Sequence, residues 1–203
     1  MIVKTAAAPR KALTHKERLL TSGARLLYAR GFQGATVDAV LDDAGVSKGT
    51  FYHHFGSKEA FGAAVLDRYV ADQEALLRRW AERDDLSVPA RLAAYHNQLR
   101  AGFVASRWRK PCLAGKLSNE LAASSDGFRH QLAAAFDTWD RMLTTLLTQG
   151  QQRGEVRTDL TADHLSRAVL AMIQGAFVAA LSLRDPAYLR SVTDGIVDLV
   201  EVR

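Results

Sequence analysis

Two short segments near the N-terminus are each framed by a residue that favours the start of a helix and by a glycine. Thr36 and Ser47 are N-cap residues, whose side-chain oxygens accept hydrogen bonds from the first turn of a helix. Gly45 and Gly56 follow, and glycine tolerates the left-handed backbone that ends many helices. Two short helices joined by a tight turn are typical of a helix-turn-helix. The expected helices span about 37–44 and 48–55.

Apolar residues elsewhere recur at helical spacing, without the strict alternation that marks a strand. Thr14 and Glu17 predict a capping box for a first helix. The 4 prolines are few enough for long uninterrupted helices. The expected fold class is therefore all-α, with nine helices. Besides the two above, the helices are expected over about 15–30, 58–83, 92–103, 111–123, 128–153, 162–183 and 186–202.

The composition is that of an ordinary globular protein, with 48% hydrophobic and 24% charged residues. A single cysteine rules out an intramolecular disulfide. No apolar run approaches the roughly 18 to 20 residues of a membrane span, and the start of the sequence has no apolar stretch of signal-peptide length. We therefore expect a cytoplasmic protein with no membrane partner.

The formal net charge of +5 is concentrated toward the N-terminal end. Residues 1–35 contain seven basic residues and a single acidic one, Glu17. A basic lobe on a near-neutral body suggests a polyanionic partner at that end. A solvated basic tail is the alternative, and the charge alone does not decide between the two.

The second short helix has the side chains that a DNA-reading helix needs. Small and polar residues at its N-terminus, over 47–50, allow it to enter a major groove about 12 Å wide. Phe51 and Phe55 are expected to anchor its opposite face on the core. Tyr52 and His53 project sideways, where they can bond phosphate oxygens.

Residues 35–59 read ATVDAVLDDAGVSKGTFYHHFGSKE, with Gly31 and Phe32 ahead of them. This run strongly resembles the signature of TetR/AcrR-type transcriptional regulators. The motif covers about 13–61, and the remainder matches in helix number and length alone. The resemblance implies a homodimeric repressor that a small ligand releases from an inverted-repeat DNA operator.

The same resemblance implies two domains and a set of DNA contacts. A flexible basic tail (1–12) is expected to precede a helix-turn-helix domain (13–56) and a helical ligand-binding and dimerisation domain (57–203). The helix N-termini near Thr36 and Lys58 can offer backbone N–H groups to phosphates. Each of these residues has a plainer role as a cap or a solvated side chain. The expected DNA-binding residues are Thr36, Ser47, Lys48, Gly49, Thr50, Tyr52, His53 and Lys58.

Broad apolar stripes run along the last two expected helices. Such a pair needs cover on two sides, and a twofold partner is the simplest cover for the second side. Packing within one chain is the alternative use of the stripes. We expect a homodimer through these two helices. Their stripes contain Leu165, Val169, Met172, Ile173, Ala176, Phe177, Ala180 and Leu181, and then Leu189, Val192, Ile196, Leu199 and Val200.

A ligand pocket is expected among the fourth to eighth helices. Aromatic residues at helical spacing more often belong to the hydrophobic core than to a ligand site. Each candidate is therefore either a core residue or a ligand-binding residue. No charge pattern identifies the ligand class, and no cofactor is expected. No metal is expected either, because the adjacent His53 and His54 do not face each other on a helix. The candidate lining residues are Tyr69, Phe103, Trp108, Leu117, Phe136, Trp139, Met142 and Phe177.

Cys112 is expected at a helix N-terminus, directly after Pro111 in the first turn. The helix dipole and Lys116, one turn later, both favour a thiolate there. Residues 112–120 also resemble the same region of electrophile-responsive, N-ethylmaleimide-type regulators of this family. Cys112 and Lys116 are therefore candidates for redox or electrophile sensing, by alkylation or oxidation. The alternative is a structural cysteine in a regulator of non-covalent ligands.

Two other classes of protein compete with a DNA-binding regulator. An all-α enzyme would need a nucleophile with a base, and Cys112 with His96 or His130 is the one conceivable pair. No Gly-rich phosphate loop, nucleophile elbow or His-Glu metal pair is present in the sequence. A protein-only adaptor would have no preference for any DNA sequence. We therefore expect no enzymatic activity.

Overall fold

A computed structural model describes residues 13–202, and the described chain folds into nine α-helices. The expected basic tail, 1–12, lies outside the described residues. An isolated antiparallel bridge joins Val156 to Glu201. The helices are α1 (His15–Gly34), α2 (Val37–Ala44), α3 (Lys48–Phe55), α4 (Lys58–Ala81), α5 (Val88–Ala105), α6 (Leu113–Leu121), α7 (Asp126–Gln152), α8 (Ala162–Leu183) and α9 (Pro186–Val200).

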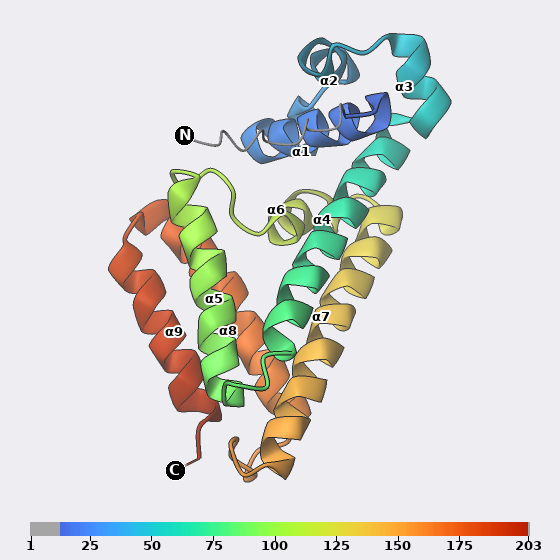
Figure 1. The fold of residues 1–203 in the computed structure, drawn as a ribbon. Helices are drawn as coiled ribbons and strands as arrows, with labels where there is room; N and C mark the ends of the chain where they lie inside the picture. Colours follow the sequence, from blue (N-terminus) through green and yellow to red (C-terminus); the bar gives the residue numbers. More distant parts are fainter. Residues whose placement is uncertain (1–12, 203) are drawn as a thin grey trace, which may run out of the picture.

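Helices α1, α2 and α3 gather at one end of the molecule (Figure 1). Their ends follow the expected capping chemistry. Thr36 Oγ1 accepts a hydrogen bond from the Ala39 N–H at 3.2 Å, and Ser47 Oγ accepts one from the Thr50 N–H at 3.3 Å. Gly45 has a φ of 60°, the left-handed conformation that glycine adopts at little cost. Arg18 donates to the carbonyl oxygen of Gly45 at 2.9 Å, which ties the turn between α2 and α3 to α1.

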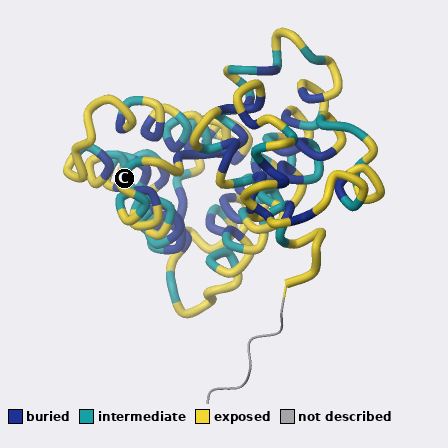
Figure 2. The backbone as a smooth tube through the Cα atoms, turned by 90° about the horizontal axis from the view of Figure 1, so that it is seen from above, coloured by how far each residue is buried: buried dark blue, intermediate teal, exposed yellow. Residues whose placement is uncertain are grey.

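Helix α4 leaves this end and runs along α7 into a body formed by α5, α7, α8 and α9 (Figure 1). The main packing partners inside the body are α7 with α8, α5 with α9, and α8 with α9. Helix α6 lies between α1 and the body, and it packs against α1, α4 and α7. Seen from above, the buried residues lie where helices face one another and the exposed residues lie on the outer turns (Figure 2).

Several helix ends differ from those expected. Helix α1 continues past Arg30 to Gly34, but Gly31 breaks it with a φ of 71°, so the expected stop is present and one further turn follows. Helix α6 begins at Leu113 rather than Pro111, because Cys112 adopts an extended N-cap conformation. Helix α6 ends at Leu121, α4 at Ala81 and α9 at Val200, each two residues before the expected end.

Helix α8 differs from the expectation that no apolar segment approaches the length of a membrane span. Its 22 residues are long and apolar enough to cross a membrane by length and composition alone. A core helix passes the same test, and α8 packs against both α7 and α9. The interior accounts for part of its hydrophobicity, since 39% of the apolar window is buried.

Candidate DNA interface and effector cavity

The N-terminal turn of α3 is exposed and carries small or polar side chains. Ser47, Lys48 and Gly49 are exposed, and Thr50 is half-buried. No atom lies within 4 Å of the position that a Cβ would take at Gly49. The surface there is open, so a rigid partner can approach the backbone of α3 closely.

The opposite side of α3 is fixed by aromatic packing. Phe51 is fully buried, and its ring centroid lies 5.0 Å from that of Phe61 on α4. The Phe55 and Phe61 rings make an edge contact with centroids also 5.0 Å apart. Tyr52 is 43% exposed and lies edge-on to Phe51, and His53 is exposed. The structure thus brings Tyr52 and His53 to the same exposed surface as the small residues.

Thr36 and Lys58 lie at the N-termini of α2 and α4. The Thr36 hydroxyl is used as a cap, as described above. Lys58 is half-buried, and its ammonium donates to the Gln33 carbonyl at 3.2 Å and lies 4.8 Å from the centroid of the Phe32 ring. Both residues therefore have structural partners within the protein. Within residues 13–202, no group of three or more His, Cys, Asp and Glu side chains can hold a metal ion.

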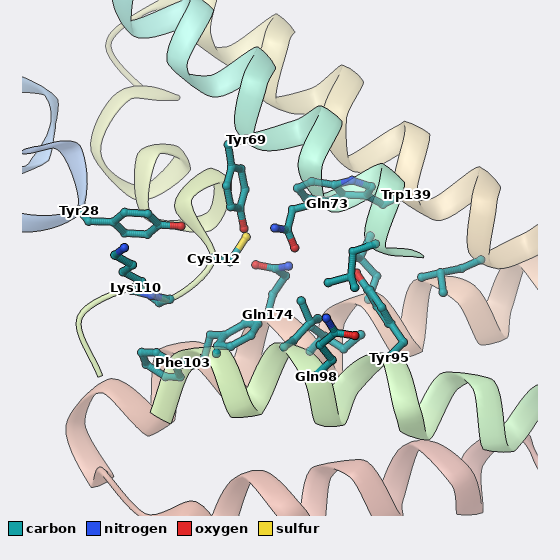
Figure 3. Close-up of a pocket in the computed structure, with 18 residues that line it drawn as sticks. Tyr28, Tyr69, Gln73, Tyr95, Gln98, Phe103, Lys110, Cys112, Trp139 and Gln174 are labelled. Atoms are coloured by element: carbon teal, nitrogen blue, oxygen red, sulfur yellow. The ribbon is translucent and has the colours of Figure 1, made fainter. Parts of the chain in front are cut away.

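A cavity of about 280 Å³ lies inside the body, between α4, α5, α7 and α8; we call it the inner cavity (Figure 3). Four of the eight predicted lining residues meet there: Tyr69, Phe103, Trp139 and Phe177. Cys112 lies at the same cavity. Polar lining residues that were not predicted are Tyr28, Gln73, Tyr95, Gln98, Lys110 and Gln174.

Two polar groups of other residues lie next to the Cys112 sulfur at this cavity. Its Sγ accepts from the Gly115 N–H at 3.4 Å, as the N-cap of α6. The Tyr69 hydroxyl points toward the sulfur (Figure 3). Burial raises the pKa values of Tyr28, Tyr69 and Tyr95 above that of free tyrosine, so all three hydroxyls stay protonated donors.

A second, larger hollow of about 800 Å³ adjoins the inner cavity; we call it the outer groove. Trp108 and Phe177, both predicted as ligand residues, line it together with Cys112 and Lys116. The Lys116 ammonium donates a hydrogen bond to the Tyr28 carbonyl of α1 at 3.0 Å. The hydrogen bond of Lys116 therefore goes to α1 and not to the Cys112 sulfur.

The remaining predicted ligand residues lie elsewhere. Phe136 lines a further hollow of about 330 Å³, which shares Leu170 and Gln174 with the inner cavity. Leu117 is fully buried in the core, and Met142 packs against the core. Neither Leu117 nor Met142 lines the inner cavity or the outer groove.

Helix α6 joins the cavities to the end of α1. The Glu120 carboxylate accepts hydrogen bonds from the backbone N–H groups of Phe32 and Gln33, both at 2.9 Å. Gly31 must be a glycine here, because a Cβ would lie 2.6 Å from a Glu120 oxygen and the φ is positive. Sequence reasoning missed Glu120, since nothing local to residues 113–121 marks a partner 88 positions away.

The histidines considered as bases do not meet Cys112. His96 is fully buried, and its Nδ1 lies 2.7 Å from Thr193 Oγ1 on α9. His130 is exposed and pairs with Arg129 at 2.9 Å. Neither histidine lines the cavity or the groove at Cys112.

Two family models match the sequence. Residues 19–65 match the model described as bacterial regulatory proteins of the tetR family. Residues 88–196 match the tetracyclin repressor-like C-terminal domain. Together the two matches span the helix-turn-helix end and most of the body.

Individual proteins are similar over most of their length. The transcriptional regulator AcuR of Cereibacter sphaeroides is 33% identical over 93% of this chain and 86% of its own length. The HTH-type transcriptional repressor NemR of Escherichia coli K12 is 35% identical over 72% of this chain and 71% of its own. A crystal structure of a regulatory protein TetR from Rhodobacter sphaeroides superposes with a TM-score of 0.86, at 31% identity, over 93% of this chain and 100% of that one.

Proposed function

Since the chain belongs to the TetR family of bacterial regulatory proteins, we propose that it is a homodimeric repressor that binds an inverted-repeat operator and is released from it by a small molecule or an electrophile. As a member of this family, it is a DNA-binding transcriptional regulator and not an enzyme. The proposed repressor acts in the cytoplasm and needs no cofactor. Its helix-turn-helix domain spans 13–56 and its effector and dimerisation domain spans 57–203.

The exposed N-terminal turn of α3 is the observation that carries this proposal. Lys48, Gly49 and Thr50 face base edges in the major groove, with Ser47 at the start of the helix. Tyr52, His53, Thr36 and Lys58 contact the phosphates on either side. The open surface at Gly49 and the aromatic anchor at Phe51 support this orientation, because a reading helix must be both accessible and rigidly held.

The proposed dimer places two copies of α3 on one face of the DNA. Helices α8 and α9 supply the interface, and exposed apolar side chains on α8, such as Val178 at 59% and Leu183 at 58%, support it. Two recognition helices about 34 Å apart, one turn of the duplex, read two half-sites of an inverted repeat.

The proposed sensing site is the inner cavity with Cys112 at its edge. Cys112 lines both hollows, and its sulfur accepts a hydrogen bond from the Gly115 N–H, so an electrophile that enters either hollow meets the sulfur. Occupation or alkylation at this position alters the N-terminal turn of α6. The bonds from α6 to α1, through Lys116 and Glu120, then pass the change to the DNA-binding end.

Selection from a pool of random duplexes tests the proposal. The wild-type protein is expected to enrich one inverted repeat, and treatment with N-ethylmaleimide is expected to release it. Cys112→Ser is expected to bind the same repeat and to resist release. A protein that enriches no sequence would contradict the DNA-binding proposal, and release of Cys112→Ser by the same reagent would show the cysteine to be structural.

A further inference from the structure

Both hollows around Cys112 are lined by basic and neutral residues without an acidic one. The outer groove contains four cationic side chains, Arg25, Arg109, Lys110 and Lys116, and no Asp or Glu is among its lining residues. The inner cavity has Lys110 at its rim, and its described lining likewise includes no Asp or Glu.

Three of the four cations have no ion pair within the described residues, although Lys110 also lines a third hollow whose lining includes Asp43 and Asp72. Arg25 is neutralised by its ion pair with Asp43. Lys116 and Arg109 instead donate to carbonyl oxygens, of Tyr28 at 3.0 Å and of Ser106 at 3.1 Å. A carbonyl satisfies the hydrogen bond without cancelling the charge. Lys110 is exposed and lines both hollows, so it lies at the passage between them.

The same groove also has an apolar side. Trp108 and Phe177 are among its lining residues. Six residues line both hollows and form the boundary between them: Tyr28, Lys110, Pro111, Cys112, Gln174 and Phe177. Beyond that boundary the polar groups are tyrosine hydroxyls, glutamine amides and the indole N–H of Trp139, all of them neutral.

We propose that the outer groove admits organic anions and excludes cations, so that the effector is an amphipathic anion. Its charged group binds at Lys110 and Arg109, and its uncharged part enters the inner cavity beside Cys112. Ammonium and guanidinium groups form strong charge-assisted hydrogen bonds to carboxylate or phosphate oxygens. A cation in the same place would lose its hydration without gaining any carboxylate partner. The inference rests on the proposed role of this domain in effector binding.

The single cysteine makes the selectivity measurable without knowing the effector. Two methanethiosulfonate reagents of similar size are compared, one with an anionic sulfonatoethyl group and one with a cationic trimethylammonioethyl group. In each case the Cys112 thiolate attacks the sulfenyl sulfur, a new S–S bond forms, and methanesulfinate leaves with the electrons of the bond that breaks. Each rate is divided by the rate of the same reagent with 2-mercaptoethanol.

The normalised rate of the anionic reagent is expected to exceed that of the cationic one by on the order of 10-fold, as a focused positive potential gives. The preference is expected to fall several-fold in Arg109→Gln/Lys110→Gln and with rising salt. Arg129→Gln/Arg141→Gln, which removes two positive charges from exposed positions on α7, is the matched control and is expected to keep the wild-type ratio.

Three results would overturn the proposal. They are a normalised ratio of one or less, a preference that persists unchanged in the double variant, and failure of both reagents to modify the folded protein while the unfolded chain reacts. The rates are measured without DNA. If the rates contradict this proposal, the proposed operator binding therefore still stands. If the protein selects no operator, the predicted rates can still be observed.

Discussion

Lys58 has structural contacts within the protein and is also proposed to contact a DNA phosphate. Its ammonium is held by the Gln33 carbonyl and the Phe32 ring, which places it at the N-terminus of α4. Lys58→Ala is expected to weaken binding to all duplex sequences alike, because a phosphate contact carries no base information. The slope of log K against log salt is expected to become shallower by about 0.9 for each phosphate that the variant no longer neutralises. Fluorescence anisotropy over a salt series measures both.

Arg141→Ala is the control for Lys58, since it removes an equal charge from an exposed position on α7. Its affinity and salt slope are expected to stay at the wild-type values. An unchanged slope in Lys58→Ala would remove Lys58 from the set of phosphate-binding residues and leave it as a structural residue between α4 and the end of α1.

His96 makes the stability of the fold depend on pH. Burial, aided by the positive charge of Arg100, lowers its pKa from 6.5 to about 4. The native state therefore keeps His96 neutral between these two values, while the unfolded chain binds a proton. The stabilisation is fully present above pH 6.5 and is lost as the pH falls toward 4, by about 2 kcal/mol between about pH 7.5 and pH 5.

Denaturant unfolding at these two pH values tests the role of His96. His96→Phe keeps a ring in the core and removes both the titration and the Nε2 atom, which has no hydrogen-bond partner in the fold. Thr193 retains acceptors at Leu189 and Asn97. The variant is expected to lose about 2 kcal/mol less than the wild type over this pH interval. Equal losses in the two proteins would assign the pH dependence to other groups.

Among the elements, α6 has the most direct connection between the cavities and the DNA-binding end. Its N-cap is Cys112, and its last turn holds Phe32 and Gln33 through Glu120. Glu120→Ala removes both bonds without touching the cavity lining. We expect the variant to react with N-ethylmaleimide at the wild-type rate, while the ratio of operator affinities before and after alkylation falls toward one.

The matched variant for this test is Ser118→Ala, because Ser118 lies on α6 two residues before Glu120 and lines neither the inner cavity nor the outer groove. It is expected to respond to alkylation like the wild type. Mass spectrometry gives the alkylation rate, and anisotropy gives the affinities. A Glu120→Ala protein that is still released in full after alkylation would show that α6 does not carry the signal through this bond.

The elements also show what the sequence predicts and what it does not. Helices α2 and α3 were predicted with their bounds, because Thr36, Gly45, Ser47 and Gly56 act on residues within four positions of themselves. The predicted start of α6 was wrong by two residues. Pro111 favours the first turn of a helix, but here α6 begins after Cys112, which is the N-cap. Local chemistry therefore determines both ends of α2 and α3, whereas α5, at Val88–Ala105, begins four residues before its expected start.

The candidate site was predictable to a smaller extent. Residues on α3 could be assigned from a continuous motif, but the cavity is assembled from helices far apart in sequence. Tyr28, a residue of the DNA-binding end, lines the cavity because α6 packs against α1. Glu120 was missed for the same reason, since its partners at 32 and 33 become visible only when α1 and α6 are placed together.

At the scale of the whole molecule, the position of the apolar faces bears on assembly. Helices α8 and α9 pack on each other and on α5 and α7, which accounts for the buried part of their stripes. On α8, Ala171, Gly175 and Val178 are exposed and share one helical face. Small residues on such a face allow another helix to approach closely, so this is where a second copy would pack.

Gly175→Arg tests this surface with little risk to the protomer. No atom lies within 4 Å of a Cβ built at Gly175, and replacing a helical glycine favours the helix by up to about 1 kcal/mol. A bulky cation is nevertheless incompatible with a close helix-helix contact. We expect sedimentation velocity to show a monomer at micromolar concentration, with unchanged or higher thermal stability of the isolated chain. Operator affinity is expected to fall by at least about 100-fold, because each monomer then reads one half-site alone. Ala133→Arg, which adds the same charge at an exposed position on α7, is expected to remain dimeric. A dimeric Gly175→Arg protein with wild-type operator affinity would move the interface away from this face of α8.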